Sequence, residues 1–396
     1  QHVRGELWYV LQDRAAGKHH RLTPAAYYVV GLMDGTHDID TIWQQAVDHL
    51  KDDAPTQDEV IGLLGQLHAA DVLRCDVSPD ALELFRRYTK KRKAFWKQRL
   101  SSPLSIRIPL WDPEKFLTAT ARFVRPLFGW FGALLWLVVV GIACVQAGVH
   151  WNEISGDFVD KALAPENLLV MFLAYPAVKA LHELGHAYAT HLWGGEVHEL
   201  GIMFLVFMPI PYVDASAASS FRDKRKRMLV GAAGIMVEAF LGSLALFVWL
   251  SVEQGAVSAF AYSVMLIGGV STVHFNGNPL LRFDGYHSLG DALEIPNLGN
   301  RSNAYLTYLL QRYLLRARNV NSPATAAGET FWLPVYGLAA LVYRMLIMVA
   351  IILLVASKFF FIGVLIALWS LFALIVMPIW KAGKFFVSSP VLARRR

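Results

Sequence analysis

The sequence predicts an α-helical polytopic membrane protein with about six spans, a re-entrant loop and a small α+β, winged-helix-like N-terminal domain. Two observations support this prediction. Of the 396 residues, 55% are hydrophobic and only 17% are charged, whereas soluble domains carry about 25% charged residues. From residue 128 onward the chain also contains long apolar runs, and about 20 apolar residues in a helix cross a hydrocarbon core ~30 Å thick.

Residues 1–78 are predicted to form the winged-helix-like domain, on the cytoplasmic side of the membrane. Segment 8–11 is strand-like, and segment 19–22 can return beside it as a second strand. A threonine before a proline at 23–24 predicts the start of a helix, and a capping box at 56–59 opens another helix. Two strands and three helices in this space indicate a winged-helix-like module.

Segment 79–127 is predicted to be a basic, amphipathic linker at the membrane surface. Its first part, 80–100, contains eight Lys and Arg residues with aromatic rings among them. This composition favours a helix that lies on anionic lipid, although a solvated linker helix also fits it. The rest is a connector in which 112–113 starts a helix. We do not expect nucleic-acid binding, because a net charge of +6 in a membrane protein first reflects basic cytoplasmic loops.

The apolar runs predict where the spans lie. They are near 128–149, 166–193, 228–250, 257–275, 331–356 and 358–380. They divide this part of the chain into a membrane core at 128–275, a cytoplasmic segment at 276–330, and two further spans with a basic tail at 331–396. Segment 222–227 is rich in Lys and Arg, whereas 151–166 is acidic. The positive-inside rule therefore places both termini in the cytoplasm.

Residues 201–213 are apolar but do not fit a span. The segment is too short to cross a membrane, and Pro209 and Pro211 would interrupt a helix. Irregular backbone at membrane depth persists only where protein covers it or where it lines a wet cavity. We therefore expect a re-entrant loop or hairpin beside the functional site; an ordinary surface loop with an apolar tip is the alternative.

The two cysteines predict neither a disulfide nor a cysteine metal site. Cys75 lies in a soluble-looking region, whereas Cys144 lies inside an apolar run. The chain starts at Gln1, and no signal peptide is visible.

The segment His182-Glu183-Leu184-Gly185-His186 is the strongest functional signal in the sequence. Positions four apart on a helix differ by about 40° in direction, so both imidazoles leave the same face and can meet one metal ion. Glu183 can reach a water on that ion without being a ligand. Zinc lowers the pKa of such a water to about 7, and a carboxylate can take its proton during attack on a carbonyl. The alternative is a pair of packed, hydrogen-bonded histidines.

The motif lies inside a predicted span, which supports a functional role. Ionisable residues within a span are costly and mark functional sites by default. From Glu166 to His182 a helix rises ~24 Å, which places the motif near the cytoplasmic boundary.

A catalytic zinc takes three protein ligands and keeps one position open, so the two histidines need a third partner. Asp284 is the best candidate, because it follows the fourth span on the cytoplasmic side and precedes a glycine. The competing residues are Glu238, His274, His287 and Asp291.

The helix motif, together with the segment 278–286 that contains Asn-Pro and Asp-Gly, resembles the site-2 protease family of intramembrane zinc metallopeptidases. It is most similar to bacterial members associated with haemolysin-type secretion adaptor proteins, which share stretches like 213–214 and 293–298. The resemblance covers about 165–300. It implies three helices that carry the zinc, Asp284 as third ligand, and a re-entrant β-like element near 200–213 that pairs with an extended substrate.

The region 5–75 resembles the small peptide-binding chaperones of ribosomal-peptide maturation. That resemblance implies a domain that holds a leader or substrate peptide by adding it as a strand to a sheet edge. A regulatory or packing domain is the alternative.

The chain departs from the family in the helix between the two metal motifs. Many site-2 proteases have an asparagine there, whereas this chain has Glu238, which either faces the site or hydrogen-bonds within the bundle. His287 is a candidate neighbour of the metal or substrate, and otherwise an ordinary polar residue at a helix start. Asp214 could orient substrate or cap the following helix, and Asn278 is a candidate hydrogen-bond donor to substrate.

These features favour a zinc-dependent endopeptidase of the bacterial cytoplasmic membrane that cleaves a membrane-inserted or membrane-delivered peptide near the cytoplasmic face. The expected partners are a peptide or membrane-protein substrate, a secretion adaptor protein and an anionic lipid surface. A non-catalytic zinc-binding scaffold for peptide secretion or maturation is the alternative, but such a protein would not need Glu183 as a base. Two other classes fit the sequence less well. A metal transporter needs polar residues along a path through the membrane, whereas here the metal-type residues cluster at one end. A di-iron lipid oxidase needs more histidine clusters than this sequence contains.

Overall fold

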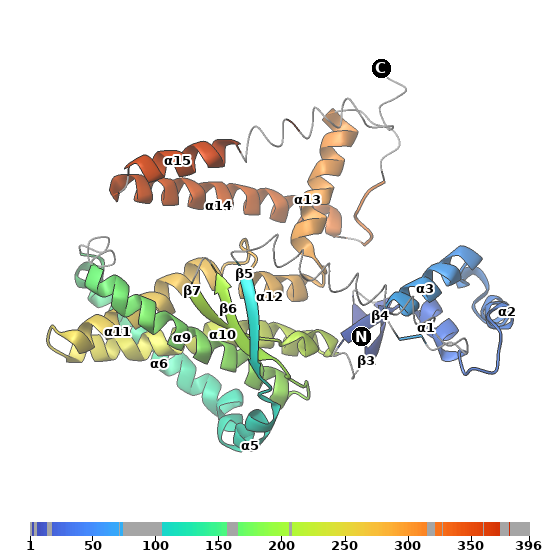
Figure 1. Ribbon diagram of the computed structural model, residues 1–396, viewed down its shortest axis with the longest axis horizontal. Helices are drawn as coiled ribbons and strands as arrows, with labels where there is room; N and C mark the ends of the chain where they lie inside the picture. Colours follow the sequence, from blue (N-terminus) through green and yellow to red (C-terminus); the bar gives the residue numbers. More distant parts are fainter. Residues whose placement is uncertain are drawn as a thin grey trace. The chain divides into compact units, whose positions relative to one another are not determined.

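The computed structural model describes residues 2–3, 6–13, 18–70, 72–73, 105–156, 165–205, 208–314, 321–326, 328–358, 360–372 and 380 (Figure 1). The chain divides into two compact units, Gln1–Val273 and His274–Arg396. The predicted basic surface helix at 80–100, the C-terminal tail and Cys75 lie outside the described residues. Cys144 is a free, exposed thiol.

The N-terminal part of the first unit contains the predicted strands and helices. Strands β3 (Tyr9–Asp13) and β4 (Lys18–Leu22) pair antiparallel, and β1 (His2–Val3) pairs with β2 (Glu6–Leu7). The helices are α1 (Pro24–Gly31), α2 (Ile39–Leu50) and α3 (Gln57–Ala69), with the short η1 (Lys51–Asp53) between the last two. They enclose a small core of Val29, Ile42, Ala46 and Val60.

Two predicted helix starts are confirmed in this part. The Thr23 side chain accepts a hydrogen bond from the amide of Ala26, so it satisfies one of the donors that a helix start leaves unpaired. Thr56 and Glu59 form the reciprocal capping box at the start of α3.

Five helices of the described chain are long and apolar enough to cross a membrane. They are α6 (Trp130–Val149), α9 (Pro165–Leu192), α10 (Lys224–Ser251), α11 (Ala256–Leu266) continued by the π-helix η4 (Ile267–Asn276), and α14 (Glu329–Lys358). The predicted sixth span begins with α15 (Phe360–Leu371), but residues 373–379 lie outside the described part.

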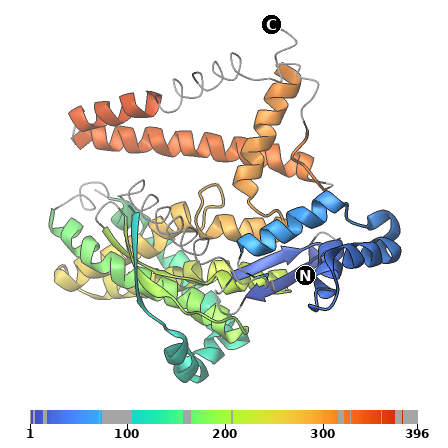
Figure 2. The same cartoon turned by 45° about the vertical axis from the view of Figure 1, so that its right-hand side comes forward.

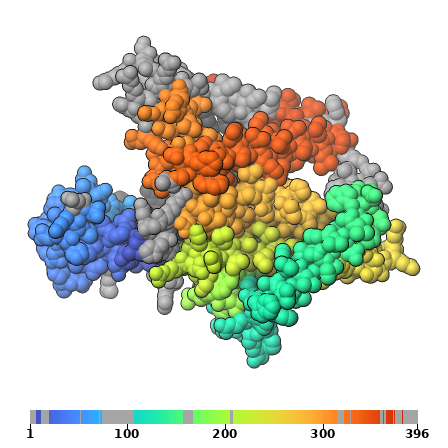
Figure 3. Space-filling model, turned by 180° about the vertical axis from the view of Figure 1, so that it is seen from behind, coloured from blue at the N-terminus to red at the C-terminus, as the bar shows by residue number. Residues whose placement is uncertain are grey.

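The apolar faces of these helices are open to their surroundings, as expected for helices in lipid. On α6, Leu137 and Val145 are 64% and 67% exposed, and Figure 3 shows this helix lying along one face of its unit. Soluble proteins rarely leave large contiguous apolar patches exposed.

Helices α9, α10 and α11 pack on one another and form the centre of the first unit (Figures 1 and 2). Small residues allow the close approach of α10 to the π-helix, since a Cβ on Gly268 would lie 2.8 Å from the Cα of Gly242. A buried apolar cluster that includes Val178, Leu246 and Met265 fills the space between the helices.

A three-stranded antiparallel sheet lies against α9. Its order is β5 (Ser105–Trp111), β6 (Leu200–Leu205) and β7 (Met208–Val213). The expected hairpin over 201–213 is confirmed by the pairing of β6 with β7, and its re-entrant position in a membrane stays a prediction. The prediction of a connector at 101–127 is wrong for 105–111, because Ile106 and Ile108 pair with β6.

Shorter helices link these elements. They are α5 (Glu114–Val124), which starts after 112–113 as predicted, η2 (Arg125–Phe128), α7 (Trp151–Ser155) and η3 (Ser216–Ser220). Leu117 of α5 is fully buried against Ala187 of α9, so α5 anchors the connection between the sheet and the spans.

The second unit contains α12 (Asp284–Leu293), α13 (Leu298–Leu309), the π-turn η5 (Leu310–Leu314), α14 and α15. Its core is built around Leu298, Tyr305 and Leu333. Arg301 of α13 donates hydrogen bonds to both carboxylate oxygens of the buried Glu329, which fixes the start of α14 against α13.

Candidate metal centre

His182 and His186 project from one face of α9, as the spacing of the motif predicts. Their side chains are buried, with 3% and 7% of the residue surface exposed. The two Nε2 atoms lie 3.0 Å apart. Two nitrogens bound to one tetrahedral zinc at about 2.0–2.1 Å are about 3.3 Å apart, so the pair is close to the separation that one ion requires.

Gly234 of α10 makes room for the two imidazoles. A Cβ at this position would lie 2.5 Å from Nε2 of His186 and 2.5 Å from Cε1 of His182. Real Cβ atoms essentially never come within 3.0 Å of a heavy atom outside their own residue and its chain neighbours. Residue 234 must therefore be glycine if the two ring nitrogens are to keep these positions.

The second nitrogen of His186 is fixed by the backbone. Its Nδ1 lies 2.7 Å from the carbonyl oxygen of Val230, which can only accept a hydrogen bond. A neutral His186 therefore carries its proton on Nδ1, and its Nε2 lone pair is available to a metal ion.

The second nitrogen of His182 faces a carboxylate. Its Nδ1 lies 3.0 Å from Oε1 of Glu238, a residue with no exposed surface. Lys179 Nζ lies 2.5 Å from the same oxygen, and the hydroxyl of Thr272 donates to the other one. Glu238 therefore hydrogen-bonds within the helix bundle and also touches the site, so both interpretations drawn from the sequence hold.

Glu183 lies beside the histidines and is only half-buried. Its Oε2 accepts a hydrogen bond of 3.0 Å from the backbone amide of Val213, at the end of β7. The carboxylate that could act as a base is thus attached to the end of the hairpin strand.

Asp284 is the first residue of α12. The glycine after it is required by the backbone, because a Cβ on Gly285 would lie 2.5 Å from the carbonyl oxygen of Gly277. His182, His186 and Asp284 offer one ligand atom each, and these atoms all lie within 4.8 Å of one another. The three residues could hold a metal ion. Among the described residues, this group does not include the competing His274, His287 or Asp291.

The donor chemistry of this group fits zinc. Two neutral imidazoles and one carboxylate are a common set for a catalytic zinc that keeps a fourth position open. The room left by Gly234 at both Nε2 atoms agrees with that use.

The remaining candidate residues have local partners. Asp214 is exposed and accepts a hydrogen bond from the amide of Ser216, the first residue of η3, whose N-cap is Ala215. Asn278 is half-buried, and its side-chain oxygen accepts from the amide of Leu280. His287 is exposed, with its ring centroid 5.1 Å from that of Tyr286. A substrate role for these residues stays a prediction.

The edge of β7 that faces away from β6 has an unusual hydrogen-bonding character. The amide of Asp214 donates back to Glu199, whereas the amide of Val213 points away to Glu183. The backbone N–H and C=O groups of successive residues point to opposite edges of a strand. Those of residues 209 and 211 therefore face the same outer edge as those of residue 213. Both are prolines and have no N–H. In the sheet as described, the outer edge of β7 thus offers carbonyl oxygens as acceptors and no amide donor at 209 or 211.

Tyr212 reinforces the base of the hairpin. Its hydroxyl donates a hydrogen bond of 2.5 Å to Oε1 of Glu199. Burial, then the contact with Glu199, raises the pKa of Tyr212 to about 12. The phenol therefore stays protonated at neutral pH and serves as a donor in this bond.

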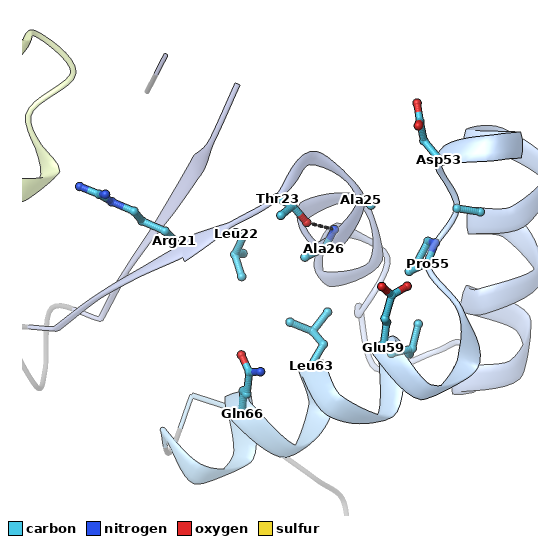
Figure 4. A pocket seen from close by; sticks show the side chains of 12 residues that line it. Arg21, Leu22, Thr23, Ala25, Ala26, Asp53, Pro55, Glu59, Leu63 and Gln66 are labelled. Carbon is cyan, nitrogen blue, oxygen red and sulfur yellow. Dashed lines mark hydrogen bonds between the residues drawn. The ribbon is translucent and has the colours of Figure 1, made fainter. Parts of the chain in front are cut away.

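A second candidate site is a groove of about 450 Å³ in the N-terminal domain (Figure 4). Strand β4 contributes Arg21 and Leu22 to its wall, and α3 contributes Leu63 and Gln66. The groove therefore lies between a sheet strand and a helix, and both apolar and polar side chains line it.

Sequence reasoning did not identify Lys179 and Thr272 as parts of the site. Lys179 is only 6% exposed, and a lysine inside an apolar span is a signal that could have identified it. Thr272 gives no comparable signal, because its hydroxyl can bond within its own helix.

No family model, no curated protein and no solved structure matches this chain. The function must therefore be inferred from the geometry described above.

Proposed function

We propose that this protein is a zinc-dependent membrane endopeptidase that cleaves a membrane-inserted or membrane-delivered peptide near the cytoplasmic face. One observation supports this most directly: the ligand atoms of His182, His186 and Asp284 lie within 4.8 Å of one another, and Glu183 follows the first histidine directly in the chain. This combination of ligands and a neighbouring base is typical of zinc hydrolases. The resemblance of segment 278–286 to site-2 proteases agrees with it.

The residues of the site have separate roles in this proposal. His182, His186 and Asp284 hold the metal. When bound, zinc supplies Lewis acidity and makes a water nucleophilic near neutral pH. Glu183 takes a proton from the attacking water and delivers it to the leaving amine. The carbonyl of Val230 keeps the proton of His186 on Nδ1, away from the metal side.

The hairpin provides a way to present the substrate. The backbone of a helix is already hydrogen-bonded, so a peptide must be extended before its carbonyl can be attacked. An extended peptide along β7 could donate its amides to the carbonyls of Pro209 and Pro211. The amide of Val213 bonds Glu183 at the end of the same strand, so a peptide held there would lead toward the base.

Membrane topology supports a site near the cytoplasmic face. Five described helices are long and apolar enough to cross a membrane. The basic segment 222–227 precedes most of α10, and the positive-inside rule places it in the cytoplasm. The predicted sixth span at 358–380 makes the number of spans even, which puts both termini on the cytoplasmic side. In view of the resemblance, we assign the protein to a bacterial cytoplasmic membrane, with a secretion adaptor and anionic lipid as partners.

A second candidate function belongs to the N-terminal domain, where the groove between β4 and α3 fits an extended peptide. Strand addition along β4 would satisfy the peptide backbone while Leu22 and Leu63 contact its side chains. If this domain delivers a peptide to a membrane site that does not cut it, the protein is a zinc-binding scaffold.

One variant separates the protease from the scaffold. Glu183→Gln keeps the size of the side chain but removes the base. We expect zinc content to stay at the wild-type level, while cleavage of co-expressed, epitope-tagged candidate peptides is lost. Glu196→Gln is the matched control, because Glu196 is an exposed carboxylate outside the site. Retained cleavage in Glu183→Gln would refute the base assignment. Wild-type protein that binds zinc and peptide but cuts none of them would favour the scaffold.

A further inference from the structure

Glu238 is a fully buried carboxylate that contacts residues of two other helices. Lys179 and His182 of α9 share its Oε1, at 2.5 and 3.0 Å, and Thr272 of η4 donates to its Oε2. Burying a charge in a membrane helix is costly unless a partner compensates it. Lys179 supplies that compensation, so the pair is neutral as a whole.

We propose that the Lys179–Glu238 pair is a positioning device for the metal ligand His182. Glu238 holds the Nδ1 side of the ring, so that Nε2 faces the metal. Lys179 and Thr272 hold Glu238. This inference rests on the proposed zinc site and names the residues that orient one of its ligands.

Helix spacing explains why this carboxylate can reach the ring. Gly234 and Glu238 are four residues apart on α10 and lie on one face. Gly234 brings the helix backbone against the two imidazoles, and Glu238 then meets His182 one turn further along. A Cβ on Gly268 would overlap the backbone oxygen of Glu238. The π-helix thus packs directly behind Glu238 and places Thr272 beside its carboxylate.

A carboxylate on the second nitrogen of a ligating histidine has known consequences. It fixes the tautomer, limits rotation of the ring and increases its basicity, and its loss typically lowers metal affinity about 10–100-fold. The rival explanation is that Glu238 only neutralises Lys179 and joins two spans. Both explanations predict damage from a single substitution, so the test needs a variant that removes the carboxylate without leaving Lys179 charged.

The experiment measures zinc affinity by chelator competition, and thermal unfolding, on the full-length protein in detergent. Glu238→Gln should lower both zinc affinity and the unfolding temperature. The double variant Lys179→Met with Glu238→Gln removes both charges. We expect it to recover most of the lost stability while its zinc affinity stays about 10–100-fold below wild type. Ser243→Ala is the matched control, because Ser243 is a buried polar residue of α10 that bonds its own helix at Ala239.

The possible outcomes distinguish the positioning role of Glu238 from the zinc site itself. Wild-type zinc affinity in either Glu238 variant would overturn the positioning role and leave the proposed zinc site intact. A double variant that recovers both stability and affinity would show that Glu238 only neutralises Lys179. Wild-type protein that binds no zinc, or binds it equally well after His186→Ala, would overturn the metal site and the positioning role together. Cleavage is not needed for any of these measurements.

Discussion

Replacing Gly234 with alanine adds one methyl group, and the structure predicts a large effect on metal binding. The added Cβ would lie 2.5 Å from Nε2 of His186, about 0.9 Å short of the 3.4 Å at which ordinary contact begins. Zinc–ligand distances in real sites stay within about 0.2 Å of their usual values. The rings must therefore move several times further than a zinc site tolerates.

The expected loss of zinc affinity for Gly234→Ala is at least about 100-fold, the upper end of the loss that follows removal of a partner behind a ligand. Such a loss corresponds to about 2.8 kcal/mol of binding free energy. The free energy of unfolding should change by less than this binding free energy. Alanine favours the helix by about 0.5–1 kcal/mol, and this gain partly offsets about 1–3 kcal/mol of overpacking.

Chelator competition with zinc, and thermal unfolding in detergent, measure these two effects separately. Gly141→Ala on α6 is the matched control, since no heavy atom lies within 4 Å of the Cβ that it would add. We expect this control to keep wild-type zinc affinity. If Gly234→Ala also bound zinc like the wild type, the geometry assigned to the two histidines would be refuted.

Three further predictions concern other parts of the chain. Arg301→Met should destabilise the protein by about 3 kcal/mol in thermal unfolding, because it removes the arginine that forms an ion pair with the buried Glu329; an unchanged unfolding temperature would contradict this. The hydrogen bond to Asp112 raises the pKa of His198 above its ordinary 6.5. The stabilisation of the folded state by this contact is therefore complete below pH 6.5 and is lost as the pH rises through the folded-state pKa. An NMR titration should show this pKa fall in Asp112→Asn. Thr56→Ala should cost about 1 kcal/mol of N-terminal domain stability in urea unfolding, because α3 loses its cap; no change there would count against the cap.

The sequence predicted the local parts of the fold and site well. Helix caps at Thr23 and Thr56 depend on neighbouring residues only, so their patterns suffice. The spacing of His182 and His186 places them on one helix face whatever surrounds it. Prolines at 209 and 211 excluded a helix and so pointed to the hairpin.

Long-range partners were harder to predict. Strand β5 alternates Ile106, Ile108 and Leu110, a pattern that fits a strand, yet it becomes one only by pairing with β6, some 90 residues later. The contact of Lys179 with Glu238 depends on how α9 and α10 are rotated about their axes. No local pattern sets that rotation, so the role of Glu238 stayed open in the sequence.

The prolines of β7 also bear on how copies of the protein behave when they are crowded together. An exposed strand edge normally invites the same edge of another molecule, which is a common route to aggregation. Two β7 edges brought together would oppose carbonyl to carbonyl at positions 209 and 211, with no hydrogen to share between them. The edge of β7 is thus unable to pair with a second β7 edge at these positions, but it can pair with another peptide that has amide N–H donors. A peptide with N-alkylated residues would not pair there, because it lacks these donors.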